Sequence, residues 1–188
     1  MERREAILIK RSQQGSQQAF EELVAMYDRR ITALIYHFLH DTEDVKDAYQ
    51  EIFLRAFQGI PGFKFKSEFS SWLYKIAVNF CINYLKKQKR YQTFSLDEQL
   101  REGGDFWKVV LPDSGKTPED EYLNFELQDH INQILAQLSA RQRSVFILKH
   151  YQGLKLAEIA EILDCQVGTV KNYLFRAVLK MRDALEKY

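Results

Sequence analysis

The sequence is poor in features that would indicate a metal site, a disulfide framework or a membrane span. Its 188 residues include only two cysteines, Cys81 and Cys165, and neither lies in a Cys-x-x-Cys or Cys/His spacing. No apolar run approaches the roughly 20 residues of a transmembrane helix. The polar start, Met1 to Lys10, lacks the pattern of a signal peptide. We therefore expect no bound zinc, two free thiols and a cytoplasmic protein.

Signatures of catalysis are also missing. The sequence has no phosphate-binding Gly-rich loop, no Gly-x-Ser-x-Gly and no His/carboxylate cluster with ligand spacing. The four histidines are scattered, and we expect them to be surface or half-buried residues: His37, His40, His130 and His150. The sequence thus predicts no catalytic residue, no metal, no cofactor and no small-molecule substrate.

The formal net charge of +1 averages three unlike segments. Residues 1–92 carry a net charge of +4, residues 93–125 carry −5, and residues 126–188 carry +2. Two mildly basic ends around an acidic middle indicate two folded units and a connector. A nearly neutral total argues against a protein that coats DNA by charge alone.

Helical periodicity dominates, and strand alternation is absent from the sequence pattern. One apolar stripe advances by three and four residues: Phe20, Leu23, Val24, Tyr27, Ile31, Leu34, Ile35 and Phe38. Ser16 can cap this helix, Asp41 can cap the next, and Pro61 with Gly62 ends it. A further helix carries its apolar side on Trp72, Leu73, Ile76, Ala77, Phe80 and Tyr84.

Turn-forming residues without periodicity mark 93–116 as a flexible acidic linker. Helical signals resume at Thr117-Pro118, and Ser139 with Gln142 forms a predicted capping box. The predicted fold is all-α, with a first domain over 1–92, the linker over 93–116 and a second domain over 117–188.

The end of the chain has the pattern of a helix-turn-helix, with predicted helices over Leu156–Leu163 and Val167–Glu186. Val170, Leu174, Ala177, Met181 and Leu185 form the expected buried stripe. The outer face can then read a major groove through Lys171, Asn172, Phe175 and Arg176, while Thr169 and the helix N-terminus can hold phosphates. An ordinary helical hairpin explains the charges but not an aromatic residue on the polar side.

Two polar faces distinguish the first domain. Asp44, Asp47, Gln50 and Glu51 line one helix opposite its apolar stripe, where spacing alone suggests a solvated face. Ser71, Lys75, Asn79 and Asn83 recur every four residues and lead toward the basic run 86–90. Basic, amide and aromatic side chains together suit single-stranded DNA, although Trp72 is equally interpretable as a core anchor.

Four blocks of the chain resemble the extracytoplasmic-function (ECF) sigma factors: Gly15–Phe20, Asp47–Phe57, Phe69–Asn79 and Val167–Lys171. The resemblance implies partners, namely core RNA polymerase, promoter DNA and an anti-sigma factor. It implies that the segment 47–60 contacts polymerase, with Asp44, Asp47, Gln50, Glu51 and Phe53 as the site residues.

The resemblance also divides promoter reading between the two domains. It implies that residues of the first domain melt and read the minus-ten element, namely Lys64, Lys66, Trp72, Lys75, Asn79 and Asn83, and that Asn79 contacts a flipped base. It implies that residues of the second domain read the minus-thirty-five element, namely Thr169, Lys171, Asn172, Phe175 and Arg176.

Three positions depart from the family pattern: Lys155, Gln166 and Tyr173. Tyr173 replaces a residue that is commonly basic, so a borrowed promoter sequence is unsafe. Two other functions remain open on the sequence alone. A stand-alone helix-turn-helix regulator would bind an operator without polymerase, and a helical adaptor would bind only proteins.

Overall fold

The protein is described by a computed structural model that covers residues 2–92 and 130–186. Throughout these two ranges every regular element is a helix, which confirms the all-α prediction. Residues 130–137 are also helical. In chain order the named helices are α1 (Glu2–Gln13), α2 (Gln17–Leu39), α3 (Thr42–Gly59), the short 3-10 turn η1 (Ile60–Gly62), α4 (Phe69–Gln92), α7 (Ala140–His150), α8 (Leu156–Ile162) and α9 (Val167–Leu185). The predicted linker over 93–116 and the predicted helix start at Thr117-Pro118 lie outside the described residues.

Helix starts follow the capping residues that the sequence predicts. The Ser16 hydroxyl accepts a hydrogen bond from the backbone N–H of Ala19, and Asp41 accepts from the N–H groups of Glu43 and Asp44. Ser139 and Gln142 form the expected reciprocal capping box at α7. Each cap satisfies donors that the first helical turn would otherwise leave unpaired.

Replacing Asp41 by Ala is expected to lower the free energy of unfolding by about 1 kcal/mol, because two N–H groups of α3 lose their acceptor. Urea unfolding followed by circular dichroism measures the change. Asp41→Asn is the control, since Asn caps about as well as Asp. Equal stability of the Ala and Asn variants would contradict this assignment.

The first half of the molecule is organised around α2, which packs against α1, α3 and α4. The predicted stripe of α2 is buried in this core, and the largest fully buried side chains include Leu23, Ile31, Leu34, Ile35, Phe38, Ile52 and Leu73. Burial of this apolar surface supplies the main driving force for folding of this half.

The second half contains the predicted helix-turn-helix, formed by α8 and α9. Ile159, Ala160, Leu163 and Val170 are buried where α8 and α9 cross. In α9, Ala177 and Met181 pack against Ile134, Leu135 and Leu138 of the preceding segment. The expectation that Leu185 is buried is wrong, because it is exposed at the last turn of α9.

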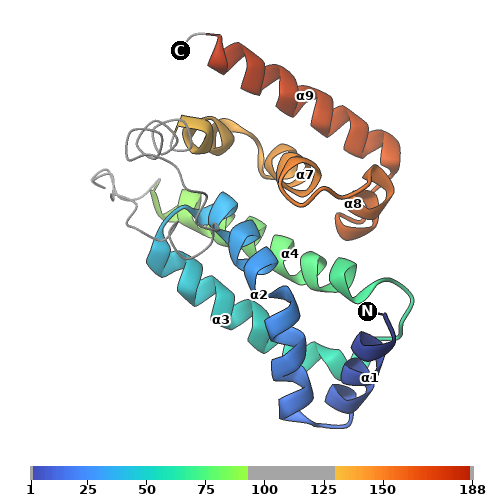
Figure 1. Ribbon diagram of the computed structural model, residues 1–188. Coiled ribbons are helices and arrows are strands. Elements are labelled where there is room, and N and C mark those ends of the chain that lie inside the picture. The colour runs from blue at the N-terminus through green and yellow to red at the C-terminus, as the bar shows by residue number, and fades with distance from the viewer. Residues whose placement is uncertain (1, 93–129, 187–188) are drawn as a thin grey trace, which may run out of the picture.

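The two halves share a continuous apolar core, and α4 is the helix that joins them (Figure 1). It packs on α2 and α3 through one side and on α7 and α8 through another. Tyr74, Val78 and Ile82 are all buried and follow one another at four-residue spacing, so they lie on one side of the helix. The Tyr74 hydroxyl donates to Oε1 of Gln152, which follows α7, across 2.9 Å. Thus α4 has a second apolar face, occupied by the second half.

Candidate nucleic-acid and partner-binding surfaces

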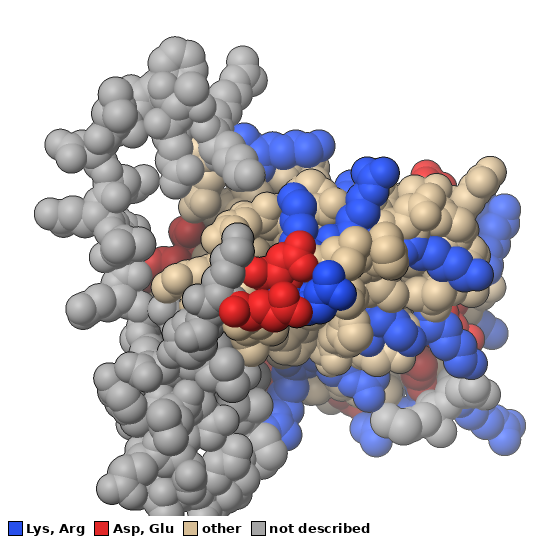
Figure 2. All heavy atoms as spheres, turned by 90° about the horizontal axis from the view of Figure 1, so that it is seen from above, with Lys and Arg blue, Asp and Glu red and all other residues tan. Residues whose placement is uncertain are grey.

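The outer face of α9 presents the side chains that sequence analysis assigned to the major groove. Lys171, Asn172, Phe175 and Arg176 are exposed, while Thr169 in the first turn is half-buried. The Phe175 ring is 65 % exposed. Viewed from above, Lys and Arg side chains predominate over the right-hand part of this side of the molecule (Figure 2). An exposed aromatic among cations and an amide can contact a thymine methyl while its neighbours bind guanine, adenine and phosphate.

Tyr173 does not lie on this outer face in the way a basic residue would. It is half-buried and packs against the apolar core. Where the family commonly has a basic side chain, Tyr173 therefore contributes a packing contact between α9 and the core.

Three of the four residues in the predicted polar row of α4 lie on the surface, whereas Ser71 at its start is buried. Lys75, Asn79 and Asn83 are exposed, and so are Lys64 and Lys66 in the loop before the helix. Trp72 is half-buried, with ring centroids 5.4 Å from Phe63 and 5.3 Å from Phe69. An added Cβ at Gly59 would lie 3.2 Å from the indole. Of the two roles predicted for Trp72, the geometry favours that of a core anchor. Only part of its ring remains accessible to a DNA base.

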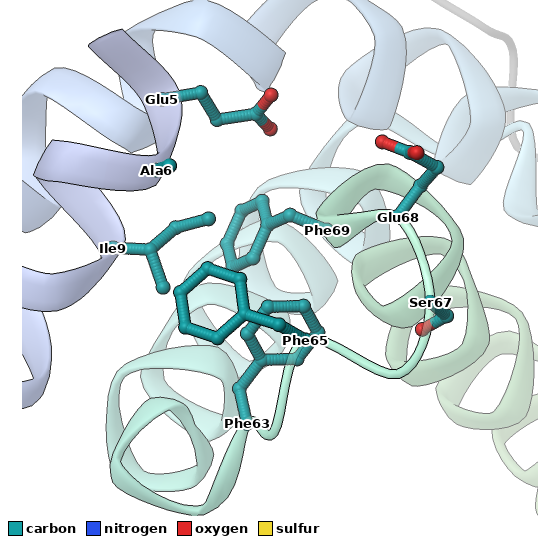
Figure 3. A pocket seen from close by; sticks show the side chains of 8 residues that line it. All are labelled: Glu5, Ala6, Ile9, Phe63, Phe65, Ser67, Glu68 and Phe69. Carbon is teal, nitrogen blue, oxygen red and sulfur yellow. The ribbon is translucent and has the colours of Figure 1, made fainter. Parts of the chain in front are cut away.

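A pocket of about 270 Å³ opens between α1 and the loop that leads into α4 (Figure 3). Its lining comprises Glu5, Ala6, Ile9, Phe63, Phe65, Ser67, Glu68 and Phe69. Three phenyl rings form one wall, and two carboxylates lie at its edge (Figure 3). The family resemblance implies a role in promoter melting for this loop, but the contribution of α1 is not visible in the sequence, because no local pattern connects Glu5 to residues some sixty positions later.

The loop conformation is held by contacts from α1. The Gln13 side-chain amide donates to the carbonyl of Ile60 at 3.1 Å and to that of Phe63 at 2.7 Å. Phe65 has a φ of 55°, an uncommon conformation for a bulky residue. Glu5 accepts a hydrogen bond from the Tyr27 hydroxyl, and burial together with this bond raises the pKa of Tyr27. The Gln13 bonds hold the backbone of the loop against α1 at the base of the pocket.

On α3, Asp47 and Gln50 are exposed, and Glu51 pairs with Arg55 at 2.7 Å. Asp44 is half-buried and accepts from the amide of Gln88 at 3.1 Å, so it is partly used within the protein.

Phe53 is the residue of this set that the structure corrects. It is only 7 % exposed and packs against Tyr49, with ring centroids 4.7 Å apart. Its place is the apolar stripe of α3, whereas Leu54, which is 50 % exposed, and Phe57 present apolar surface outward. Phe57 is 39 % exposed although its spacing continues the apolar stripe of α3 through Phe53.

The histidines were expected to be surface or half-buried residues, and His37 alone departs from this, because it is buried. His37 and the half-buried His40 lie at the contact between the two halves, and the ring of His37 is centred 3.6 Å from that of Tyr151. Cys81 is buried and Cys165 half-buried, and both are free thiols. Among residues 2–92 and 130–186, no group of three or more His, Cys, Asp or Glu side chains is arranged to hold a metal ion. None of the described helices is both long and apolar enough to span a bilayer.

Comparison with known families divides the chain in the same way. Residues 23–91 match the family "Sigma-70 region 2", and residues 129–181 match "Sigma-70, region 4". Both matches fall within the predicted domains, whose bounds stay a prediction. Two helical units of these classes, in this order, define a sigma factor of the sigma-70 type.

Comparison with individual proteins shows to which group of sigma factors the chain belongs. The chain is 36 % identical to the ECF RNA polymerase sigma factor SigW of Bacillus subtilis, over 95 % of this chain and 93 % of that protein. It is 34 % identical to the ECF RNA polymerase sigma-E factor of Escherichia coli K12, over 91 % of this chain and 88 % of that protein. The chain therefore belongs to the extracytoplasmic-function sigma factors, as its sequence blocks indicate.

A solved structure agrees on the fold. CnrH in complex with the cytosolic domain of CnrY superposes with a TM-score of 0.72 over 98 % of both chains, at 22 % identity. As a member of its family, this protein is an alternative sigma factor, which binds core RNA polymerase and directs it to promoter DNA. Its relatives are regulators of transcription initiation rather than enzymes.

Proposed function

We propose that α9 reads the minus-thirty-five element of the promoter and that α4, with the loop 63–69, opens and reads the minus-ten element. The observation that carries this assignment is the presence of two exposed faces of DNA-binding chemistry, one in each half. Thr169, Lys171, Asn172, Phe175 and Arg176 form the first face, and Lys64, Lys66, Lys75, Asn79 and Asn83, with part of Trp72, form the second. Two weak contacts held by one polymerase act as a bivalent reader of spaced elements.

The pocket beside α1 is the proposed receptor for one base flipped out of the duplex. Its volume of about 270 Å³ lies just below the range of small-ligand sites, so it suits a single flat ring system. Phenyl rings stack on any base, while carboxylates favour bases that carry an amino group. Capture of the base offsets the few kcal/mol that unpairing costs.

Replacing Phe65 by Ala is expected to reduce open-complex formation about 5- to 150-fold, since stacking of one base is worth about 1–3 kcal/mol. Potassium permanganate footprinting of unpaired thymines measures opening at a promoter. The exposed Phe175→Ala variant is the aromatic control: it should weaken initial promoter binding but not opening once the complex is saturated. Opening that is unchanged by Phe65→Ala would contradict the pocket assignment.

The exposed side of α3 is the proposed contact with core polymerase, through Asp47, Gln50, Glu51 and Leu54. Asp44 contributes through the part of its carboxylate that Gln88 and Tyr84 leave free, and Phe53 supports the helix from inside. The chain itself carries out no chemistry in this proposal, because phosphodiester synthesis belongs to the polymerase. Its working place is then the cytoplasm, where polymerase and chromosome are. An anti-sigma factor is a further proposed partner, supported by the structure of the sigma factor RpoE in complex with the anti-sigma factor NepR from Bartonella quintana, which has a similar fold.

Run-off transcription with bacterial core polymerase on a fragmented-genome template, with and without the protein, tests the proposal. We expect new transcripts that start downstream of a shared two-part motif. If polymerase gains no start sites and the protein does not co-elute with it, the sigma-factor assignment fails. Tight operator binding by the isolated protein would then indicate a stand-alone regulator.

A further inference from the structure

A buried cation from the second half of the molecule contacts the end of α2 in the first half. Arg143 of α7 is only 4 % exposed, and its Nη2 lies 2.7 Å from Nε2 of His40. His40 directly follows α2 and has a φ of 64°. The main polar contact at this point of the interface is therefore between an arginine and a histidine.

The chemistry of this contact requires a neutral histidine. A guanidinium group has N–H donors and no acceptor, so Nε2 of His40 must offer its lone pair. A proton on Nε2 would remove that acceptor and place two cations 2.7 Å apart in a partly buried site. Arginine cannot relieve the conflict by losing its own proton near neutral pH.

Among the described residues, none of the groups that shift the pKa of His40 or Arg143 is a carboxylate. The groups that face His40 and Arg143 are Tyr36 and His37 from α2, Cys81 from α4 and, beyond α7, Tyr151 near His37. Asp41, the next residue, turns its carboxylate to the N-terminus of α3, and Glu158 of α8 accepts from the backbone of Lys155. Among the residues that the structure covers, Arg143 forms no ion pair with a carboxylate.

Two further polar atoms show that the contact is not fully satisfied. Nδ1 of His40 and Nε of Arg143 are buried without a hydrogen-bond partner in the described parts of the chain. Buried polar atoms without partners cost stability and are relieved when water reaches them. Opening of the interface would hydrate both atoms.

We propose that the His40–Arg143 contact is a pH-sensitive latch between the two halves, closed while His40 is neutral and opened when His40 takes up a proton. Opening would uncover the second apolar face of α4, formed by Tyr74, Val78 and Ile82, and let the two DNA-reading faces change their separation. The latch is a property of the free protein and does not depend on which promoter is read.

The direction of the pH effect follows from the two states of His40. Burial, together with the neighbouring Arg143, lowers the pKa of His40 from 6.5 to about 3 in the closed form. A solvated His40 in the open form would regain a value near 6.5. The closed form thus binds fewer protons, so its advantage is complete above about pH 6.5 and is lost as the pH falls from there toward 3. One such histidine raises the opening constant about tenfold between about pH 7.5 and about pH 5.5.

Distance measurement on the isolated full-length protein tests the latch. Spin labels or dyes at Glu21→Cys on α2 and Asp183→Cys on α9, in a Cys165→Ser background, report the separation of the halves; Cys81 is buried. We expect the ratio of open to closed molecules to rise at least about tenfold over that pH range, with helix content unchanged by circular dichroism. If open molecules are too few to count, the alkylation rate of Cys81, relative to the urea-unfolded chain at the same pH, gives the opening constant.

Two histidine variants make the test specific. His40→Asn removes one titrating group but tolerates the positive φ, and should remove the tenfold share that His40 contributes. His37, whose pKa burial and Arg143 lower to about 4, keeps its own share in this variant. His150→Asn, at the exposed end of α7, should keep the tenfold share of His40. An opening constant that is independent of pH, or that keeps its full pH dependence in His40→Asn, would overturn the latch. The experiment needs neither polymerase nor DNA, so its failure would leave the proposed function standing.

Discussion

Replacing Arg176 by Ala is expected to lower transcription from a two-element promoter about 5- to 150-fold, since one bidentate base contact is worth about 1–3 kcal/mol. Arg176 is exposed on the outer face of α9, so the loss should come from DNA binding and not from unfolding. Adding Lys171→Ala should weaken binding further and reduce the salt dependence of log K by about one, as expected for one phosphate contact. Run-off transcription over a salt series measures both effects.

The matched control lies on the same helix. Arg182 is exposed, forms ion pairs with Asp183 and Glu186, and is placed away from the proposed reading face. Arg182→Ala should leave transcription within about twofold of the original, as is usual for surface ion pairs. A second comparison uses a promoter template whose upstream element is scrambled. If Arg176→Ala reduces transcription equally when the upstream element is scrambled, α9 does not read that element.

Replacing Leu54 by Asp is expected to weaken binding to core polymerase about 30-fold or more, the effect of losing an interface hot spot of about 2 kcal/mol. Leu54 is half exposed on α3, directly beside the buried Phe53, so the substitution removes surface apolar contact without opening a core cavity. A titration of fluorescently labelled protein with core polymerase measures the dissociation constant.

Ile7 on α1 provides the comparison, because it has the same chemistry and nearly the same exposure as Leu54. Ile7→Asp should bind core polymerase with unchanged affinity. Equal losses in both variants would point to a general effect of apolar surface, and no loss in Leu54→Asp would remove α3 from the polymerase interface.

Sequence alone was sufficient for the elements whose signals are local. Caps at Ser16, Asp41 and Ser139 are single-residue signals that act on the next turn, and each forms the predicted hydrogen bonds. The helix-turn-helix and the exposed set on α9 also follow from periodicity, because one buried stripe leaves the opposite face to solvent.

The sequence-based predictions were incomplete or wrong where the burial or contacts of a residue depend on a partner far away in the sequence. Periodicity gave α4 one apolar face, since it recognises a stripe but not a second packing neighbour, and it therefore passed over Tyr74, Val78 and Ile82. Periodicity likewise cannot predict the contact between Arg143 and His40, because these residues are 103 positions apart in the sequence. Phe53 was assigned to polymerase through family resemblance, although its position on the buried stripe already argued for packing.

The second apolar face of α4 has a consequence for synthesis on the ribosome. The first half can complete its own core once Gln92 has emerged, but α7 and α8, which cover Tyr74, Val78 and Ile82, are encoded later. At about 5–20 residues per second, the roughly 60 residues up to the end of α7 take about 3–12 s. Throughout that interval the nascent chain carries an uncovered hydrophobic strip, which makes it a substrate for chaperones and proteases before its second half can fold back.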